Sequence, residues 1–382
     1  MSTASTRRWN GGTCRQPSSG GRGRTDRTSA TAHLAAIGTA VPDHDIHQAF
    51  IDWAARRLTD PRTTAVFARM AARSGIEHRW SVLPPTDTGG SPVAADGFYA
   101  DAVLPGTAAR MAIYADAAPA LALQAVADLS RRADLTGITH LVVASCTGFV
   151  APGIDQRIAR ALGLDSSVER LLVGFMGCYA AVTALRSARH IVRSEPDARV
   201  LVVTVELSTL HLQAVDAVEP LLAMLQFGDG AAAALVTADP GGLALDAPFA
   251  TTLPDSDALI RWDITDRGFA MHLSGEVPAR IAAGLADPDF ASAATGGRDP
   301  ATIDAWAVHA GGRSILDAVA HAFALPEAAL ADSRAVLRDN GNMSSATLMF
   351  ALARMIGRPI DRGVALAFGP GLAAEGLGFH SA

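Results

Sequence analysis

The sequence predicts a duplicated α/β fold in which two similar halves stack into five layers, αβαβα. Strand-like apolar runs alternate with helical segments from about residue 32 to the C-terminus, which indicates a largely parallel sheet covered by helices. The order of these segments repeats in the last third of the chain, as expected for an internal duplication. The chain has 382 residues, of which 49% are hydrophobic, enough for two such units with a large core.

The first half supplies most of the assignable elements. An initial strand ends at Pro42, and a loop rich in proline, glycine and aspartate covers residues 84–105. Apolar residues at helical spacing predict helices at residues 43–58, 63–75, 109–133, 151–163, 178–194 and 218–226. Short apolar runs predict a buried strand at residues 139–145 and further strands at residues 170–175, 199–207 and 228–238.

The last third repeats the alternation. Strands are expected at residues 304–310 and 363–371, and helices at residues 312–323 and 341–357. In the first half Cys178 begins the central helix, and in the second half an asparagine of "GNMSS" begins the equivalent one. We therefore divide the ordered chain into an N-terminal half, residues 31–245, and a C-terminal half, residues 246–382.

Composition limits the possible functions. The net charge of −6 gives no electrostatic reason to expect a nucleic acid partner. No apolar run is long enough to span a membrane. Three scattered cysteines do not suit a disulfide framework or a structural zinc site. We therefore expect a cytoplasmic protein without a metal site.

The first thirty residues differ from the rest of the chain. They contain six arginines against the single acid Asp26, together with many glycine and serine residues and few aliphatic ones. An apolar core of the kind found in secretory signals is missing. This composition predicts a disordered basic tail at residues 1–30.

Cys178, His309 and Asn342 are the candidate catalytic residues. Cys178 lies at a helix N-terminus, where backbone N–H groups and the helix dipole favour a thiolate. His309 ends a buried strand and is followed by two glycines, a place where α/β folds bind ligands. Taken singly, Cys178 and His309 could be core residues, and Asn342 could be a helix cap. Together they suit a thiolate–imidazolium pair with an amide donor for a thioester oxygen.

Five motifs in the same order then resemble the type III polyketide synthases, the chalcone synthase-like family. They are "GFMGCYAAV", "QFGDGAAAA", "HAGGRSILD", "GNMSSATLMF" and "AFGPGLAAE". The resemblance implies a thiolase-type fold, a homodimer and an acyltransferase without a cofactor. Such an enzyme condenses malonyl-CoA repeatedly, with decarboxylation, onto an acyl-CoA starter, and cyclises the product to a pyrone or a resorcinol-type phenol. The sequence is closest in style to bacterial alkylpyrone and alkylresorcinol synthases.

The resemblance also implies a role for each catalytic residue. Cys178 resembles the nucleophile that carries the acyl chain, and His309 the histidine that sustains its thiolate. His309 and Asn342 would hold the malonyl thioester carbonyl and stabilise the enolate formed by decarboxylation.

The remaining candidate residues concern substrate binding. Phe227 resembles the aromatic gate between the CoA tunnel and the reaction cavity, and Arg69 and Arg73 resemble contacts to CoA phosphates. Further positions expected around the pocket are Met271 in place of a second gating phenylalanine, Trp262 in place of a glycine, His211 in place of a small polar residue, Cys146 in place of a threonine, and Ser344 and Gly371. A bulky Trp262 should narrow the plant-type cavity, and a flexible Met271 could open another path for an alkyl chain.

Two other hypotheses fit the same residue set. A ketoacyl-ACP synthase III-like enzyme would carry out a single condensation on an ACP-bound malonyl group. A non-catalytic thiolase-fold protein would bind acyl-CoA as a sensor. The "GNMSSA" and "FGPG" motifs favour the polyketide class over the first, and the intact Cys-His-Asn set argues against the second.

Overall fold

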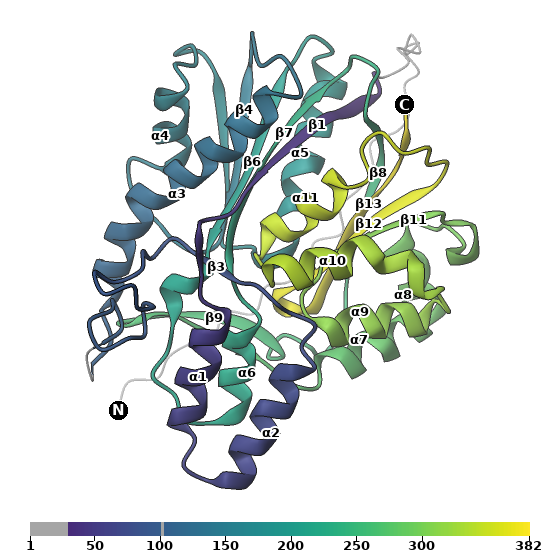
Figure 1. The fold of residues 1–382 in the computed structure, drawn as a ribbon. Helices are drawn as coiled ribbons and strands as arrows, with labels where there is room; N and C mark the ends of the chain where they lie inside the picture. The colour runs from purple at the N-terminus through teal and green to yellow at the C-terminus, as the bar shows by residue number, and fades with distance from the viewer. Residues whose placement is uncertain (1–29, 101–102) are drawn as a thin grey trace, which may run out of the picture.

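The computed structural model describes residues 30–100 and 103–382 (Figure 1), so nearly all of the predicted basic tail lies outside the described residues. Within this part of the chain a nine-stranded sheet has the order β11-β12-β13-β8-β1-β7-β6-β4-β5. None of the helices described is long and apolar enough to cross a membrane.

The N-terminal half supplies five strands of this sheet. They are β1 (Ala32–Ala40), β4 (His140–Ser145), β5 (Glu169–Gly174), β6 (Val200–Leu207) and β7 (Asp229–Thr237). β4 pairs in parallel with β5 and β6, whereas β7 runs antiparallel to β1 and β6. Helices α3 (Thr107–Ser130) and α4 (Ile154–Ala161) cover the outer face and enclose the first apolar cluster.

The C-terminal half supplies the other four strands. They are β8 (Leu243–Thr252), β11 (Ala305–Val308), β12 (Gly363–Gly369) and β13 (Ala373–Ser381). Their outer helices are α7 (Val277–Ala286), α8 (Pro288–Thr295), α9 (Arg313–Ala322) and α10 (Ala331–Asn340). These helices and strands enclose a separate apolar cluster around Trp306.

Two buried helices form the middle layer. α5 (Ala180–Ser194) and α11 (Ser345–Ala353) contact strands of both halves and each other (Figure 1). The largest apolar cluster joins these helices to the inner faces of both sets of strands. The predicted αβαβα layering is therefore confirmed. The expectation of a largely parallel sheet was wrong, because among the described strands of this sheet only β4–β5, β4–β6 and β11–β12 pair in parallel. A short antiparallel pairing of β1 with β8 joins the two halves into one continuous sheet.

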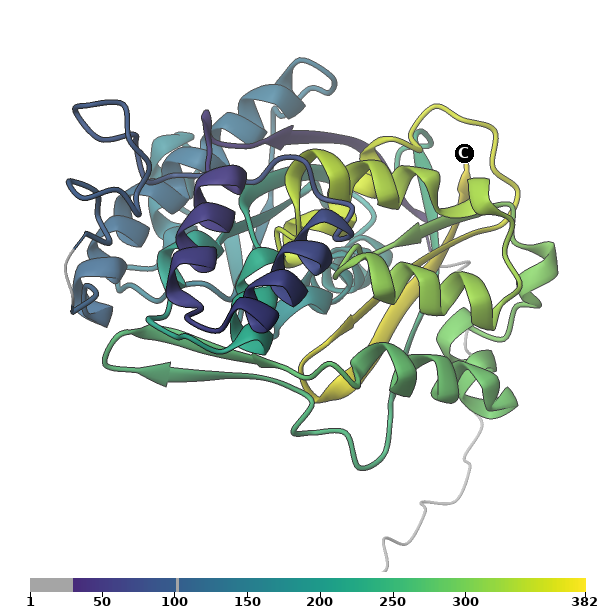
Figure 2. The ribbon, with the colours of Figure 1, turned by 60° about the horizontal axis from the view of Figure 1, so that its bottom comes forward.

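A smaller group of elements lies beside the end of the N-terminal half. Helices α1 (His47–Arg57), α2 (Pro61–Ala72) and α6 (Val218–Leu225) pack together, and the hairpin of β9 (Ile260–Thr265) and β10 (Gly268–Leu273) runs along them (Figure 2). The two-residue strands β2 (His44–Asp45) and β3 (Trp80–Ser81) pair just before the start of α1. A cavity lies within this group of elements.

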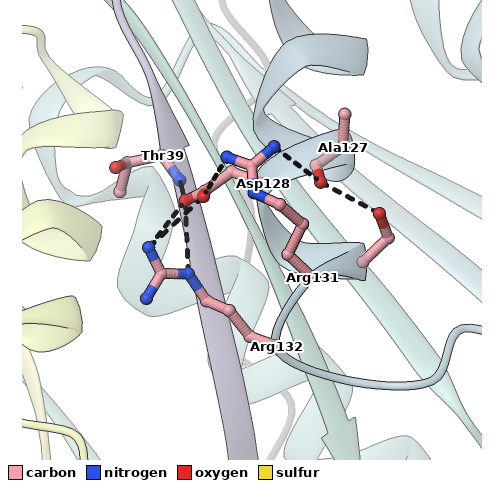
Figure 3. A network of polar contacts seen from close by, with 6 residues as sticks. Thr39, Ala127, Asp128, Arg131 and Arg132 are labelled. Carbon is pink, nitrogen blue, oxygen red and sulfur yellow. Dashed lines mark hydrogen bonds and ion pairs between the residues drawn. The ribbon is translucent and has the colours of Figure 1, made fainter.

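One buried carboxylate ties an outer helix to the sheet. Asp128, near the end of α3, accepts a hydrogen bond from the backbone N–H of Thr39 on β1 at 2.9 Å (Figure 3). Arg131 and Arg132 form ion pairs with the same carboxylate at 2.7 and 3.2 Å. Burial raises the pKa of Asp128, but these partners outweigh it and lower the pKa overall. The network fixes the end of α3 against β1.

The sequence prediction was wrong at the start of the second central helix. The helix predicted at residues 341–357 begins only at Ser345, so Asn342 does not open it. Gly341 and Ser344 both have positive φ angles, 66° and 46°, which interrupt the helical path. Residues 239–303 and 324–340 received no predicted elements, although they form β8, the β9–β10 hairpin and helices α7, α8 and α10.

Candidate active site

Cys178 lies in a tight turn between β5 and α5. The turn is a 3-10 segment, Gly177–Tyr179, that leads directly into α5. Gly177 has a φ of 73°, a conformation that favours glycine. A Cβ atom there would also lie 2.6 Å from Pro370 Cδ. Both the backbone and the packing therefore require glycine immediately before the cysteine.

The turn before α11 places Asn342 and Ser344 beside this cysteine. The backbone of Asn342 is held from both sides, donating to Gln226 at 2.7 Å and accepting from Gly228 at 3.1 Å. Its Oδ1 accepts from the Ser344 N–H at 2.8 Å. Ser344 Oγ then lies 3.8 Å from Cys178 Sγ. Two turns from different halves of the chain thus meet at the cysteine.

His309 reaches the same region from the C-terminal half. It directly follows β11, and its backbone N–H donates to Leu366 on β12 at 2.8 Å. The Asn342 side chain donates from Nδ2 to the carbonyl of Gly311, two residues after His309, at 3.2 Å. The His309 side chain is 1% exposed, and neither ring nitrogen has a partner among the described residues. Both nitrogens are therefore available to a ligand.

Burial, rather than the helix N-terminus, dominates the electrostatics of the site. It raises the pKa of Cys178 to about 12, with a further contribution from Glu206, against the hydrogen bonds from Ser344 and Asn342. Burial also lowers the pKa of His309 to about 3. Taken group by group, burial favours the neutral thiol and the neutral imidazole, whereas the helix position favours the thiolate. Ionising either group alone is unfavourable, whereas transferring a proton from Cys178 to His309 creates opposite charges together.

Glu206 on β6 organises the region behind the cysteine. Its carboxylate accepts hydrogen bonds from Thr147 Oγ1 at 2.9 Å, from the Cys146 N–H at 3.0 Å and from the Ser345 hydroxyl. Cys146 Sγ lies 3.3 Å from the same carboxylate and 3.2 Å from Ser344 Oγ. Cys146 therefore belongs to a buried polar cluster next to Cys178.

An apolar cavity of about 260 Å³ lies within the group formed by α1, α6 and the β9–β10 hairpin. Four of the predicted pocket residues line it: Phe227, Met271, Trp262 and His211. Trp262 and Met271 are directly opposite each other on β9 and β10. Phe227 also forms a backbone bridge with Asn342. It thus connects the cavity to the residues around Cys178.

His211 supports the wall of this cavity. Its Nε2 lies 2.8 Å from the carbonyl of Thr147, and its Nδ1 accepts from the Phe269 N–H at 3.0 Å. The ring stacks on Phe269 with centroids 4.2 Å apart and meets Trp262 edge-on. Burial lowers the pKa of His211 to about 3. Its neutral ring donates from Nε2 and fixes β10 in place.

The other predicted residues lie on two sides of the site. Arg69 and Arg73 are exposed at the end of α2, and Arg313, at the start of α9, donates to the Arg73 carbonyl at 3.3 Å. This end of α2 is therefore next to the loop that follows His309. Gly371 has a φ of 70° and follows Pro370, the residue that packs on Gly177.

Two residues of the site could not be singled out in the sequence. Thr147 bonds to Glu206 and to His211, and Phe269 forms the face on which His211 stacks. The position of Thr147 next to Cys146 was the only available signal. Phe269 gave none, because an aromatic residue on a strand usually indicates ordinary core packing.

Comparisons with known proteins agree with one another. The family models described as chalcone and stilbene synthases, N-terminal and C-terminal domains, match residues 20–240 and 244–382. Bisdemethoxycurcumin synthase of Oryza sativa subsp. japonica is 34% identical over 389 residues, which covers 94% of each chain. An alpha-pyrone synthesis polyketide synthase-like protein of Mycobacterium tuberculosis is 31% identical over 369 residues, covering 92% of this chain and 91% of that protein.

Solved structures show the same similarity. PKS-I of the brown alga Ectocarpus siliculosus superposes with a TM-score of 0.84 at 28% identity, covering 94% of this chain and all of that one, 100%. The C-terminal type III polyketide synthase domain of Steely1, a type I/III hybrid from Dictyostelium, has a TM-score of 0.81 at 26% identity. It covers 92% of this chain and 99% of that domain.

Proposed function

Because the chain belongs to the chalcone and stilbene synthase family, we propose that Cys178, His309 and Asn342 perform the condensation that this family catalyses. The chain is a type III polyketide synthase, a condensing acyltransferase that uses malonyl-CoA and an acyl-CoA starter. Because both family models match and together cover most of the chain, we retain neither the single-condensation hypothesis nor the sensor hypothesis. The observation that carries the residue assignment is the series of contacts that runs from the loop after His309 through Asn342 and Ser344 to Cys178.

Loading of the starter begins with the sulfur of Cys178. His309 accepts the thiol proton, and the thiolate attacks the carbonyl carbon of the acyl-CoA thioester. The C–S bond to CoA breaks, and the CoA thiolate leaves with the proton from His309. The products are an acyl-cysteine and free CoA. The partial exposure of Cys178 supplies the access that this step needs.

Extension uses the same His309 and Asn342 as hydrogen-bond donors. Burial keeps His309 neutral, so one ring N–H can donate to the malonyl thioester oxygen. One side-chain N–H of Asn342 donates to the Gly311 carbonyl, and the second is free to donate to the malonyl thioester oxygen. These donors stabilise the enolate that forms when carbon dioxide leaves. The enolate carbon then attacks the acyl-cysteine and releases Cys178 for the next cycle.

The apolar cavity beyond Phe227 is the proposed site for the hydrocarbon part of the starter and the growing chain. Its lining is mainly aliphatic, aromatic and methionine side chains, including Trp262 and Met271, which suits an apolar acyl group. Arg69 and Arg73 would contact the CoA phosphates at the mouth. We propose a pyrone or a resorcinol-type phenol as product, and the alpha-pyrone synthesis protein of Mycobacterium tuberculosis supports the first.

We further propose a homodimer that forms along β5. β5 ends the sheet, and its outer edge has no neighbour among the described strands. Leu171 and Leu172 on this strand are 43% and 45% exposed, and Phe149 beside it is 46% exposed. An apolar open edge favours pairing with a second copy. Light scattering should give a dimer for the wild type, and Leu172→Glu should shift it toward monomer; a monomeric wild type would contradict this.

Two smaller proposals complete the assignment. The division into residues 31–245 and 246–382 is supported by the family models, which end at residue 240 and resume at residue 244. A cytoplasmic location is supported by the chemistry, because the free thiols of Cys146 and Cys178 persist in a reducing compartment.

The test of the function is product analysis. Malonyl-CoA should be supplied with acyl-CoA starters of increasing chain length, without any carrier protein, and the products identified by mass. Wild-type protein should form pyrones or phenols with one preferred range of starter length, and Cys178→Ala should form none. Condensation that persists in Cys178→Ala would show that another group carries the acyl chain.

A further inference from the structure

Ser344 lies against the catalytic cysteine and Cys146 lies against Ser344, but neither has a role in the reaction above. Ser344 Oγ lies 3.2 Å from Cys146 Sγ and 3.8 Å from Cys178 Sγ. Both side chains are almost completely buried, with exposures of 3% for Cys146 and 1% for Ser344. A serine hydroxyl has a single hydrogen. Ser344 can therefore donate to only one of the two sulfurs at a time.

The neighbouring Glu206 determines how Cys146 competes for that hydrogen. Glu206 is surrounded by the Cys146 N–H, the Cys146 thiol, Thr147 Oγ1 and the Ser345 hydroxyl. Burial raises the pKa of Glu206 overall, and the hydrogen bonds from these donors offset only part of that rise. The geometry directs the Cys146 hydrogen at the Glu206 carboxyl group and leaves the Cys146 sulfur to accept from Ser344.

The backbone of Ser344 is held in an unusual conformation. Its φ and ψ are 46° and −126°, a backbone conformation that residues other than glycine rarely adopt. The bond from its N–H to Asn342 Oδ1 and the bond from the Met343 N–H to Thr347 Oγ1, both 2.8 Å, hold the turn in this shape. A glycine would adopt it with less strain. The strained backbone thus holds a serine hydroxyl between two sulfurs.

We propose that Ser344 is a positioning residue whose hydroxyl donates to Cys178 when that sulfur is a thiolate, and to Cys146 when it is a thiol or a thioester. Cys146 competes for the hydroxyl and so moderates how readily the thiolate forms. This inference depends on the proposed role of Cys178 as nucleophile. It requires no oxidant and no bond change, because only the direction of one hydroxyl hydrogen differs between the two states.

The other ionisable groups near the turn of Cys178 do not provide the same contact. Of the elements packed on this turn, α11 and β12 have no titratable side chain. On β13, Glu375 is paired with Arg186 of α5 at 3.0 Å, and His380 lies 3.3 Å from Asp246. Farther along α5 are Arg189, His190 and Arg193, and the turn itself contains Tyr179. His309 remains the proton acceptor for Cys178, and its contribution is unchanged by substitutions at Ser344 or Cys146.

The test measures how fast iodoacetamide alkylates Cys178 between pH 7 and pH 9 in the full-length protein. Mass spectrometry of the peptide that contains Cys178 separates this reaction from alkylation of other cysteines. Only the thiolate reacts, so loss of a donor to it should slow alkylation. Ser344→Ala and Ser344→Gly should each slow alkylation about tenfold, because losing this hydrogen bond to the thiolate should raise the pKa of Cys178 by about one unit. Cys146→Ala should accelerate it by about threefold, because the competitor is gone.

The double variant Cys146→Ala/Ser344→Ala separates competition from a direct effect. It should react at the rate of Ser344→Ala alone. If removing Cys146 accelerates alkylation equally without the Ser344 hydroxyl, Cys146 acts directly on Cys178 and the competition is disproved. Unchanged rates in both Ser344 variants would disprove the hydroxyl contact. Ser187→Ala, which removes a hydroxyl bonded to Thr183 on α5, is the control and should leave the rate unchanged.

Two features keep the test decisive. Ser344→Gly relieves the strained backbone, so it should fold even if Ser344→Ala does not. Alkylation needs no substrate, so its result is independent of condensation. The alkylation rates of the Ser344 and Cys146 variants could follow the expected order while Cys178→Ala protein still catalyses condensation. That result would refute the proposed function and leave the hydroxyl contact intact.

Discussion

Replacing Gly177 with alanine tests whether the turn before Cys178 is fixed by packing as well as by backbone conformation. Gly177 has a φ of 73°, and a Cβ there would lie 2.6 Å from Pro370 Cδ and 2.7 Å from Pro370 Cγ. Gly163, after α4, is a matched control. It has a φ of 63°, but no atom would lie within 4 Å of its added Cβ.

The two substitutions share one cost and differ in another. A residue with a side chain in the left-handed region loses about 1–2 kcal/mol, which applies to both positions. Only Gly177→Ala adds an overpacking cost of about 1–3 kcal/mol, because the ring of Pro370 must move. We therefore expect Gly177→Ala to lower the free energy of unfolding by about 2–5 kcal/mol, and Gly163→Ala by about 1–2 kcal/mol.

Urea unfolding and condensation assays measure the two consequences. The unfolding midpoint gives the stability difference at a constant slope. Gly163→Ala should retain normal condensation, whereas Gly177→Ala should lose most of it, because the shift of Pro370 and the turn displaces Cys178. If both variants lost equal stability and both stayed active, Pro370 would have no part in fixing the cysteine.

Three further predictions concern the site. Asn342→Ala should slow malonyl-CoA decarboxylation roughly 100- to 1000-fold, the usual effect of losing one oxyanion donor; carbon dioxide release at the wild-type rate would contradict this role. Burial lowers the pKa values of His309 and His211 from 6.5 to about 3, so the unfolded chain binds more protons below pH 6.5. The wild type should therefore lose more free energy of unfolding than a His309→Gln variant as the pH decreases from about 6.5 toward 3; the variant is the reference because burial raises the pKa of Asp229 to about 7, which shifts both proteins in the opposite direction. Equal urea-unfolding profiles for the two proteins would argue against a neutral buried His309 ring. Trp262→Ala should enlarge the cavity and shift the preferred starter to longer acyl chains, measured by product masses. Ile264→Ala, at an exposed position of the same strand and outside the cavity lining, is the control; an unchanged preference in Trp262→Ala would place the acyl chain elsewhere.

Local sequence patterns were sufficient for most of the first half of the fold. The strands around residues 140, 200 and 230 are continuous apolar runs, and strands buried on both faces have this composition. The start of α11 was misplaced, because the positive φ angles of Gly341 and Ser344 leave no mark in the pattern of apolar residues. Periodicity records which residues are buried, and it does not record a backbone held out of the helix by Asn342.

The sequence by itself determined the class of fold, the family and the three candidate catalytic residues, because each depends on motifs that are short and local. The tertiary structure decided what surrounds them. Ser344 and Cys178 are 166 residues apart, and Ser344 and Cys146 are 198 apart, so no local pattern could reveal that one hydroxyl faces two sulfurs. Burial likewise opposes the thiolate that the helix position favours and raises the pKa of Cys178 to about 12, because the cost of removing a charge from water depends on every element packed around it.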